Sequence, residues 1–470
     1  MTPPENLTFL SRDELLALLV ELQRQIAELT ARNAALQAEI EQLRRGAKRQ
    51  AAPFSKGTRV ANPKRPGRKP GAGPFHYRGA PLPEQITEPP VDVPVTLAAC
   101  PACGGPRAEE RVDCASTTAI PAIPRPQVTP YRVAVCRCRV CGKQVRGQHP
   151  DVAPDQHGAP AHRVGHRAMA AAHGLHDGIG IPGRKVPWVL ETLHGLTLTQ
   201  GAITQDALRR ATGEVGRAYA RVRAAVPERP VVHTDDTGWR VGGAPASLMA
   251  CETDEVTVYQ IRSQHRHEEV QEVMPTDYAG VMVTDRGRSY DAQAFDAVAQ
   301  PKCLAHILRS ISEVLQTKKG RSRDVGERLK GLLQDAIQLW HAGHTGEVAG
   351  FVTEAQRLRD ALTHHLRPRL LSDPDNQRLL NGIGQQHDRG HVRRFVADPQ
   401  VEPTNHRAER VLRPAVIARK VSQCSKNPAG AQAFAALKSV VQTLAKQGVG
   451  SMVEGLYHLF RSTRPHAASP

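Results

Sequence analysis

The sequence predicts a multidomain protein in which an N-terminal coiled coil, a cysteine-rich module and a helical region precede a large α/β domain. The chain has 470 residues, which is too long for one compact domain. Leucine and isoleucine repeat with heptad spacing near the N-terminus. In the C-terminal half, β-branched runs that end on carboxylates alternate with helical patterns, which indicates an α/β domain.

Residues 13–45 predict one long helix without glycine or proline. Its apolar seam advances in alternating steps of four and three through Leu15, Leu19, Leu22, Ile26, Leu29, Asn33, Leu36, Ile40 and Leu43. A seam with this period packs against a second helix, and Asn33 within it favours a two-stranded pairing in one register. Packing of an amphipathic helix on the chain's own globular part is the alternative. We expect a parallel homodimeric coiled coil.

Residues 46–80 predict a disordered basic linker, because lysine and arginine stand among proline, glycine and alanine and cannot form a core. Arg68 and Lys69 lie in the segment Pro-Gly-Arg-Lys-Pro and are candidate contacts to the phosphates of DNA. Across the whole chain, 63 Lys and Arg stand against 46 Asp and Glu, a net charge of +17. This surplus indicates a polyanionic partner, usually nucleic acid.

Two Cys-x-x-Cys pairs, Cys100 with Cys103 and Cys138 with Cys141, lie within residues 95–150, and each pair is followed by glycine. Four thiolates in two such knuckles predict a zinc ribbon, a structural site whose four positions are all filled by protein. Cys136 is a further thiol that could replace Cys138. Nine cysteines without a secretory signal or a membrane-length apolar run favour a reducing cytoplasm and exclude a membrane partner.

Residues 158–225 predict a helical region rich in histidine, arginine and alanine. A helix at 186–194, a turn at Gly195 and a second helix that begins at Gln205 after the capping residue Thr204 have the outline of a helix-turn-helix. Such a region would bind DNA. Ordinary helix packing gives the same outline, so both interpretations remain open.

The α/β domain is expected over residues 228–455. Its predicted order is strand-strand-strand-helix-strand-helix, at 231–236, 247–251, 256–261, 267–273, 280–285 and 290–297. The first and fourth strands end near Asp235 and Asp285, and adjacent central strands would bring these carboxylates side by side. Charged residues at about 320–395 predict a helical insertion, after which Pro403 precedes a helix that carries Glu409.

Two aspartates at strand ends and one helical glutamate are suitable ligands for two magnesium ions, the arrangement used in phosphoryl transfer. Each acid alone has an ordinary explanation: a turn residue for the aspartates, a surface ion pair for Glu409. His306, in the helix that Cys303 opens, could contact substrate, order a carboxylate or simply pack. Four basic residues of the Glu409 helix are candidate contacts to DNA phosphates: Arg410, Arg413, Arg419 and Lys420.

Four segments closely resemble the blocks of insertion-sequence 66 family transposases: HTDDTGW, VTDRGRSYD, CLAHILRS and PTNHRAERVLRPAVIARK. The resemblance implies a ribonuclease-H-like catalytic domain whose Asp-Asp-Glu triad aligns on Asp235, Asp285 and Glu409. It agrees with the zinc-binding module and the leucine-rich N-terminus. Asp236 stands where the family commonly has glutamate, and the sequence leaves open whether Asp236 assists Asp235.

These observations predict a bacterial, nucleoid-associated DNA transposase with two catalytic magnesium ions and one structural zinc ion. It would cleave transposon ends and join the freed 3′ hydroxyl to target DNA as a homodimer. The sequence leaves open whether it also needs accessory proteins encoded by the element. Two alternatives share parts of the pattern. A ribonuclease-H-like nuclease or resolvase would cut without joining, and a DNA-binding regulator derived from a transposase would have lost the chemistry.

Overall fold

The structure is a computed structural model that describes residues 11–47, 81–93, 97, 99–106, 115–117, 125–153, 155–158, 161–344, 350–398, 400–448 and 452–461. The chain divides into two compact units, one of residues Met1–Pro53 and Arg125–Pro470 and one of residues Phe54–Pro124. The predicted basic linker, with Arg68 and Lys69, lies outside the described residues apart from its first two positions.

Helix α1 (Arg12–Ala47) contains the whole range predicted as a coiled-coil helix. The seam residues whose side chains are described are exposed, among them Leu19, Leu22, Ile26, Leu29 and Leu36. Arg24 pairs with Glu21 and Glu28 on the helix surface, spacings that support an isolated helix modestly. The helix is therefore observed with its apolar seam uncovered, and its pairing with a second helix stays a prediction.

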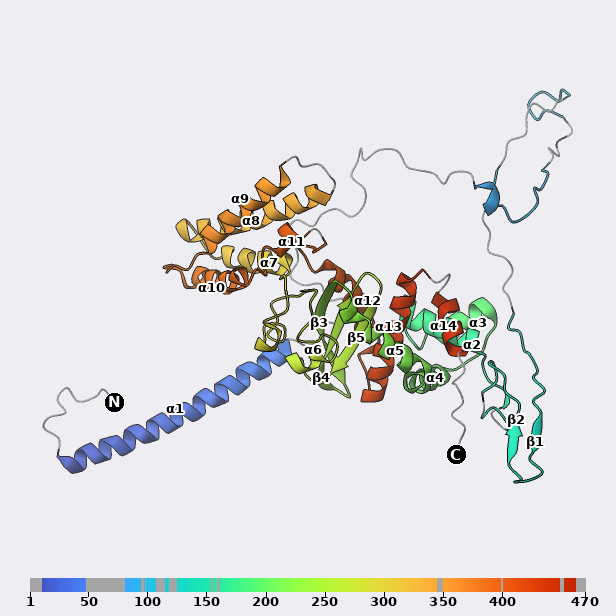
Figure 1. The fold of residues 1–470 in the computed structure, drawn as a ribbon, viewed down its shortest axis with the longest axis horizontal. Helices are drawn as coiled ribbons and strands as arrows, with labels where there is room; N and C mark the ends of the chain where they lie inside the picture. The colour runs from blue at the N-terminus through green and yellow to red at the C-terminus, as the bar shows by residue number, and fades with distance from the viewer. Residues whose placement is uncertain are drawn as a thin grey trace. The chain divides into compact units, whose positions relative to one another are not determined.

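A mixed four-stranded sheet in the order β5-β4-β3-β6 forms the centre of the C-terminal region (Figure 1). Its strands are β3 (Val231–Val241), β4 (Ala244–Glu252), β5 (Thr257–Arg262) and β6 (Val281–Val283). β3, β4 and β5 form an antiparallel meander, and β6 pairs in parallel with β3 after helix α6 (His267–Gln271). Gly242 and Gly243 form the two-residue β3–β4 turn at φ +59° and +84°, a left-handed conformation that glycine adopts readily.

Two predictions for this region are wrong in detail. The first strand does not end at its carboxylates but continues to Val241, because β4 pairs with it from His233 to Val241, with Asp235 opposite Ala250. The helix predicted at 290–297 is reduced to a 3-10 turn, Gln293–Phe295. Tyr290 and Phe295 are fully buried, so tertiary packing holds this segment against the sheet in an irregular path.

Both faces of the sheet are covered. On one face, α12 (His406–Ser422) and α13 (Pro428–Lys446) pack on β3, β4 and β5 through a core of Trp239, Leu248, Ala250, Tyr259, Ile261, Leu412, Ala415, Ala431 and Ala435. On the other face, Met249, Cys251 and Val258 pack against the loop residues after β5, with α5 (Glu214–Ala224) at the margin. Because side chains alternate along a strand, consecutive residues of β3 face different layers.

Helices occupy the residues between the second and third predicted acids. They are α7 (Leu304–Leu315), α8 (Arg321–His344), α9 (Phe351–Leu366), α10 (Pro374–Asp388) and α11 (Arg394–Ala397). Figure 1 shows them gathered in one bundle. Their leucine-rich core includes Ile307 of α7 and extends to Val283 of β6. The bundle therefore packs against the strand that leads to Asp285.

A second helical group comprises α2 (His166–His173), the π-helix η4 (Gly174–Ile179), α3 (Val186–His194), α4 (Gln200–Thr212), α5 and α14 (Met452–Arg461). The predicted cap at Thr204 is wrong. α4 begins at Gln200, because the Thr199 hydroxyl accepts a hydrogen bond from the Ala202 amide at 3.1 Å. Thr204 lies inside the helix, and its hydroxyl donates to the Gln200 carbonyl at 3.0 Å.

Short elements complete the described chain: β1 (Val135–Arg137) and β2 (Gln144–Arg146), which form an antiparallel hairpin, and the 3-10 turns η2 (Pro83–Gln85) and η5 (Val226–Glu228). The β1–β2 turn carries the second cysteine pair. None of the helices in the described ranges is long and apolar enough to cross a membrane.

Candidate functional site

The parallel pairing of β3 with β6 sets the positions of the two predicted aspartates. The paired residues run from Val231 opposite Val281 to His233 opposite Val283. Asp235 and Asp285 each lie two residues beyond that last pair, so they are level with each other at the same edge. The carboxylate oxygens of Asp235, Asp236 and Asp285 lie within 4.8 Å of one another. The structure thus brings both predicted aspartates together, with Asp236 as a third member.

The side chains of Asp235 and Asp236 lie on opposite faces of the sheet. Asp235 lies opposite Ala250, whose side chain packs in the layer formed with α12 and α13, whereas Asp236 lies opposite Met249, which packs in the other layer. Asp236 has neighbours of its own there. Its carboxylate lies 3.6 Å from His265 Nδ1, and it accepts a hydrogen bond from the Ser247 hydroxyl at 3.4 Å.

Glu409 lies in the first turn of α12, and Asn405 places that turn. The fully buried Asn405 side chain donates to the Thr234 carbonyl at 2.7 Å, and its Oδ1 lies 3.2 Å from His233 Nδ1. Asn405 therefore joins the start of α12 to the two residues that precede Asp235. Sequence reasoning missed this link between Asn405 and β3.

The carboxylates repel one another in a partly dehydrated site. Burial raises the pKa of Asp235 to about 7; the negative charges of Asp285, Asp236 and Glu409 add to this, and a hydrogen bond from the Asp236 amide opposes it. Burial and Asp285 likewise raise the pKa of Asp236, against the opposing influence of His265. Glu409 acts electrostatically on Asp235 but lies outside the group of Asp235, Asp236 and Asp285, whose negative charge a bound cation would neutralise.

A buried lysine organises the loop that carries Asp285. Lys302 is 2% exposed, and its Nζ lies 2.9 Å from Thr284 Oγ1, 2.8 Å from Asp291 Oδ1 and 3.1 Å from Gln300 Oε1. Asp285 Oδ1 accepts a hydrogen bond from the Gly287 amide at 2.8 Å. Sequence reasoning missed Lys302, for which the available signal was a lone lysine directly before Cys303.

The predicted phosphate contacts on α12 differ in their surroundings. Arg410, Arg413 and Lys420 are exposed. Arg419 is half-buried and donates to the Thr237 hydroxyl at 2.9 Å and to the Gly238 carbonyl, so its guanidinium joins α12 to β3. The three exposed cations are free to face solvent or nucleic acid.

The two cysteine pairs have the same local geometry. The Cys100 amide donates to the Gly105 carbonyl at 3.0 Å, and the Cys138 amide donates to the Lys143 carbonyl at 2.8 Å. In each turn, backbone amides two and three residues ahead donate to the first sulfur and lower the pKa of Cys100 and of Cys138. Amides directed at sulfur favour the thiolate that binds metal. The two pairs belong to different compact units.

Comparison with known proteins identifies the family. A search of curated proteins finds no match to the chain. The model of the family described as "Transposase IS66 family" matches residues 174–433, more than half of the chain and all three predicted acids. The match also includes the sheet, the helical bundle and α12 up to its end. The chain therefore belongs to the IS66 family of transposases.

Proposed function

We propose that this transposase cleaves transposon-end DNA and joins the freed 3′ hydroxyl to target DNA, on a ribonuclease-H-like domain at residues 228–455. The observation that carries the proposal is the level placement of Asp235 and Asp285 on parallel neighbouring strands, with Glu409 acting on Asp235 from α12. Membership of a transposase family makes DNA the substrate class and phosphoryl transfer the reaction class.

The residues fit a pair of magnesium ions. Asp235, Asp285 and Glu409 offer hard carboxylate oxygens, the ligands that magnesium prefers. The raised pKa of Asp235 reflects its burial and the neighbouring negative charges. Two magnesium ions, when bound, would supply activation of the attacking oxygen and stabilisation of the leaving oxygen. The protein's own part is positional: Asn405 holds α12 against β3, and Lys302 with Thr284 holds the loop of Asp285.

Asp235 is the better candidate for the first acid. It belongs to the sheet face that α12 covers, so it shares that face with Glu409, whereas Asp236 faces His265 and Ser247 in the opposite layer. Asp236 would therefore not bind the metal directly. It would add negative charge to the cluster from the opposite face of the sheet, while Asp235 and Glu409 hold the metal.

The contacts to DNA would come from several basic segments. Arg410, Arg413 and Lys420 are exposed on α12, the helix that carries Glu409, and their side chains can approach phosphates without breaking a described ion pair. Arg419 would act indirectly, because it is bound to β3. Arg68 and Lys69 of the linker and the helices at 158–225 are further proposed contacts. In α4, Gln200, Thr204 and Gln205 form an exposed polar face.

A structural zinc ion and a homodimer complete the proposal. Cys100, Cys103, Cys138 and Cys141 would hold the zinc; Cys138 is favoured over Cys136 because its amide and sulfur form the knuckle turn, while Cys136 lies within β1. The exposed seam of α1 would pair with its copy and bring two transposon ends together.

The test is magnesium-dependent cleavage and joining of labelled transposon-end DNA by the wild type and by Glu409→Gln. Joining by the wild type that the variant loses, with end binding retained, supports the proposal. Cleavage without joining would favour a nuclease or resolvase. Tight end binding without any reaction by the wild type would favour a DNA-binding regulator, or a transposase that needs accessory proteins.

A further inference from the structure

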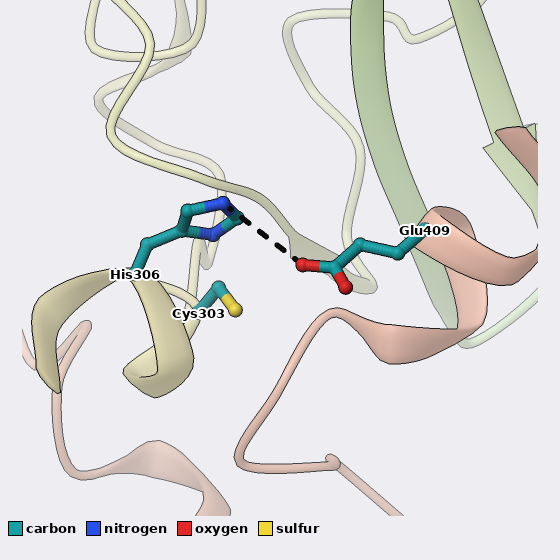
Figure 2. Close-up of side chains that lie close together, drawn as sticks. All are labelled: Cys303, His306 and Glu409. Carbon is teal, nitrogen blue, oxygen red and sulfur yellow. Dashed lines mark ion pairs between the residues drawn. The ribbon is translucent and has the colours of Figure 1, made fainter. Parts of the chain in front are cut away.

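A second group of potential ligands contains Glu409 together with two residues at the start of α7. A sulfur, an imidazole nitrogen and a carboxylate oxygen from Cys303, His306 and Glu409 lie within 4.8 Å of one another. Figure 2 shows Cys303 and His306 at the start of α7, facing Glu409 on α12. His306 Nε2 lies 3.9 Å from Glu409 Oε1.

Cys303 has the local structure of a metal-binding cysteine. It is the N-cap of α7 and 1% exposed, and its sulfur accepts the Asn405 amide at 3.2 Å. The backbone amides of Ala305 and His306 also donate to it. The cysteine knuckles of Cys100 and Cys138 have the same pattern, in which amides two and three residues ahead are directed at the sulfur. Burial raises the pKa of the Cys303 thiol and these amides oppose that rise, so they would stabilise the thiolate once a cation replaces the thiol proton.

The spacing suits a tetrahedral ion. Zinc bonds of about 2.0–2.3 Å separate neighbouring ligand atoms by roughly 3.3–3.8 Å, and the distance from His306 to Glu409 is already 3.9 Å. Small side-chain rotations can shorten the remaining distances between the ligand atoms. No hydrogen bond holds the His306 ring at Nδ1, which is buried without a partner among the described residues. Thiolate, imidazole and carboxylate together select a borderline cation such as zinc or cobalt over magnesium.

We propose that Cys303, His306 and Glu409 form a second metal site, specific for a zinc-like cation, whose occupation holds Glu409 away from Asp235 and Asp285. Three protein ligands leave the fourth position open to water. The effect on Glu409 rests on the proposed function, in which Glu409 also binds catalytic magnesium. The site itself does not.

The binding test is a cobalt titration of the full-length chain carrying one zinc ion per protomer, enough to fill the proposed four-cysteine site and leave the Cys303 site empty, read as the thiolate-to-cobalt charge-transfer band. The band should appear in the wild type and in Cys251→Ser, a matched change of another buried cysteine, and be absent from Cys303→Ser. His306→Gln and Glu409→Gln should weaken cobalt binding by more than the roughly 10–100-fold caused by removing an outer-sphere partner.

No band in the wild type, or an equal band in Cys303→Ser, would overturn the site. If Cys303→Ser does not fold, His306→Gln serves as the test variant. Unchanged cobalt affinity in His306→Gln would overturn the proposed site. In the DNA assay, zinc added against constant magnesium should inhibit the wild type at several-fold lower concentration than Cys303→Ser. Equal inhibition of the wild type and Cys303→Ser by zinc would show that occupation of the site does not affect Glu409. If the chain does not cleave DNA at all, the cobalt titration alone tests the site.

Discussion

Asp285 lies beside Asp235 because β3 and β6 pair in parallel, and each residue stands two positions past the last backbone pair, His233 with Val283. Neighbouring parallel strands end at the same edge, so equal distances along each strand give equal heights. Burial and the charge of the neighbouring Asp285 raise the pKa of Asp235, and two carboxylates at one height can bind a cation together. The parallel pairing of β3 with β6 therefore brings the segments that carry Asp235 and Asp285 into one site.

We expect Asp235→Asn to abolish DNA cleavage and Asp236→Asn to reduce it much less. Asp235 shares the sheet face of Glu409, whereas Asp236 faces His265. The Asp235 change should cost at least the roughly 10²–10³-fold seen when one preorganised electrostatic group is removed. Cleavage rates at saturating magnesium, with end-binding affinity as the control, test the order. Equal loss in both variants would assign the two aspartates equal roles.

A buried histidine predicts how stability depends on pH. His173 is 1% exposed; burial alone would favour its neutral form, but hydrogen bonds to Asp177 and Asp206 at 3.2 and 3.1 Å outweigh burial and raise its pKa to about 9. A raised pKa means that this stabilisation is complete below the unfolded value near 6.5 and is lost as pH rises through about 9.

The loss should amount to about 3 kcal/mol between those pH values, converted at 1.36 kcal/mol per pKa unit. Urea unfolding of the wild type and of His173→Gln at pH 6, 7.5 and 9 measures it. The wild type should lose stability over this range, and His173→Gln should show a flatter profile, whatever its absolute stability. Parallel profiles would contradict the assignment.

Lys302 should stabilise the loop of Asp285 through its pair with Asp291. Lys302→Met leaves Asp291 without its cation, and losing one partner of a buried pair costs about 3–5 kcal/mol. Since Asp291 is partly exposed, the loss should fall at the lower end of that range. The double variant Lys302→Met/Asp291→Asn should recover part of it. Unfolding free energies of the wild type, Lys302→Met, Asp291→Asn and the double variant form the test, and strictly additive losses would show that the pair is not coupled.

The meeting of Asp235 and Asp285 could be predicted from sequence because both follow β-branched runs, and strands of one sheet place their ends together. The roles of Asn405 and Lys302 could not. Asn405 bonds to Thr234 across 171 positions, a contact that no local periodicity encodes. The start of α4 was misplaced because Thr199 and Thr204 are both competent caps, and burial of Ile203 within the first turn favours the earlier one. Packing of Tyr290 and Phe295 likewise overrode the local helix signal.

The choice between Cys136 and Cys138 can be tested by zinc content. Cys138→Ser and Cys141→Ser should each lose the bound zinc, since both remove a proposed ligand. Cys136→Ser should retain it, because Cys136 pairs with Val145 inside the β1–β2 hairpin, away from the knuckle turn. Metal analysis of the purified full-length proteins distinguishes them. Retention of zinc in Cys138→Ser with loss in Cys136→Ser would show that Cys136, and not Cys138, is the zinc ligand.

The last prediction concerns the exposed seam of α1. Leu29 is 63% exposed in the single chain, a position that a two-stranded coiled coil would bury. Leu29→Glu would place two carboxylates against each other in that core. Truncating a packed leucine already costs about 2–5 kcal/mol, and a buried charge adds to it, so the variant should become monomeric at micromolar concentration. Ala31→Glu, on the outer surface of the same helix, adds the same charge and should remain dimeric. Sedimentation equilibrium of the full chain measures the mass of each, and a monomeric wild type, or equal masses for the two variants, would exclude pairing through this seam.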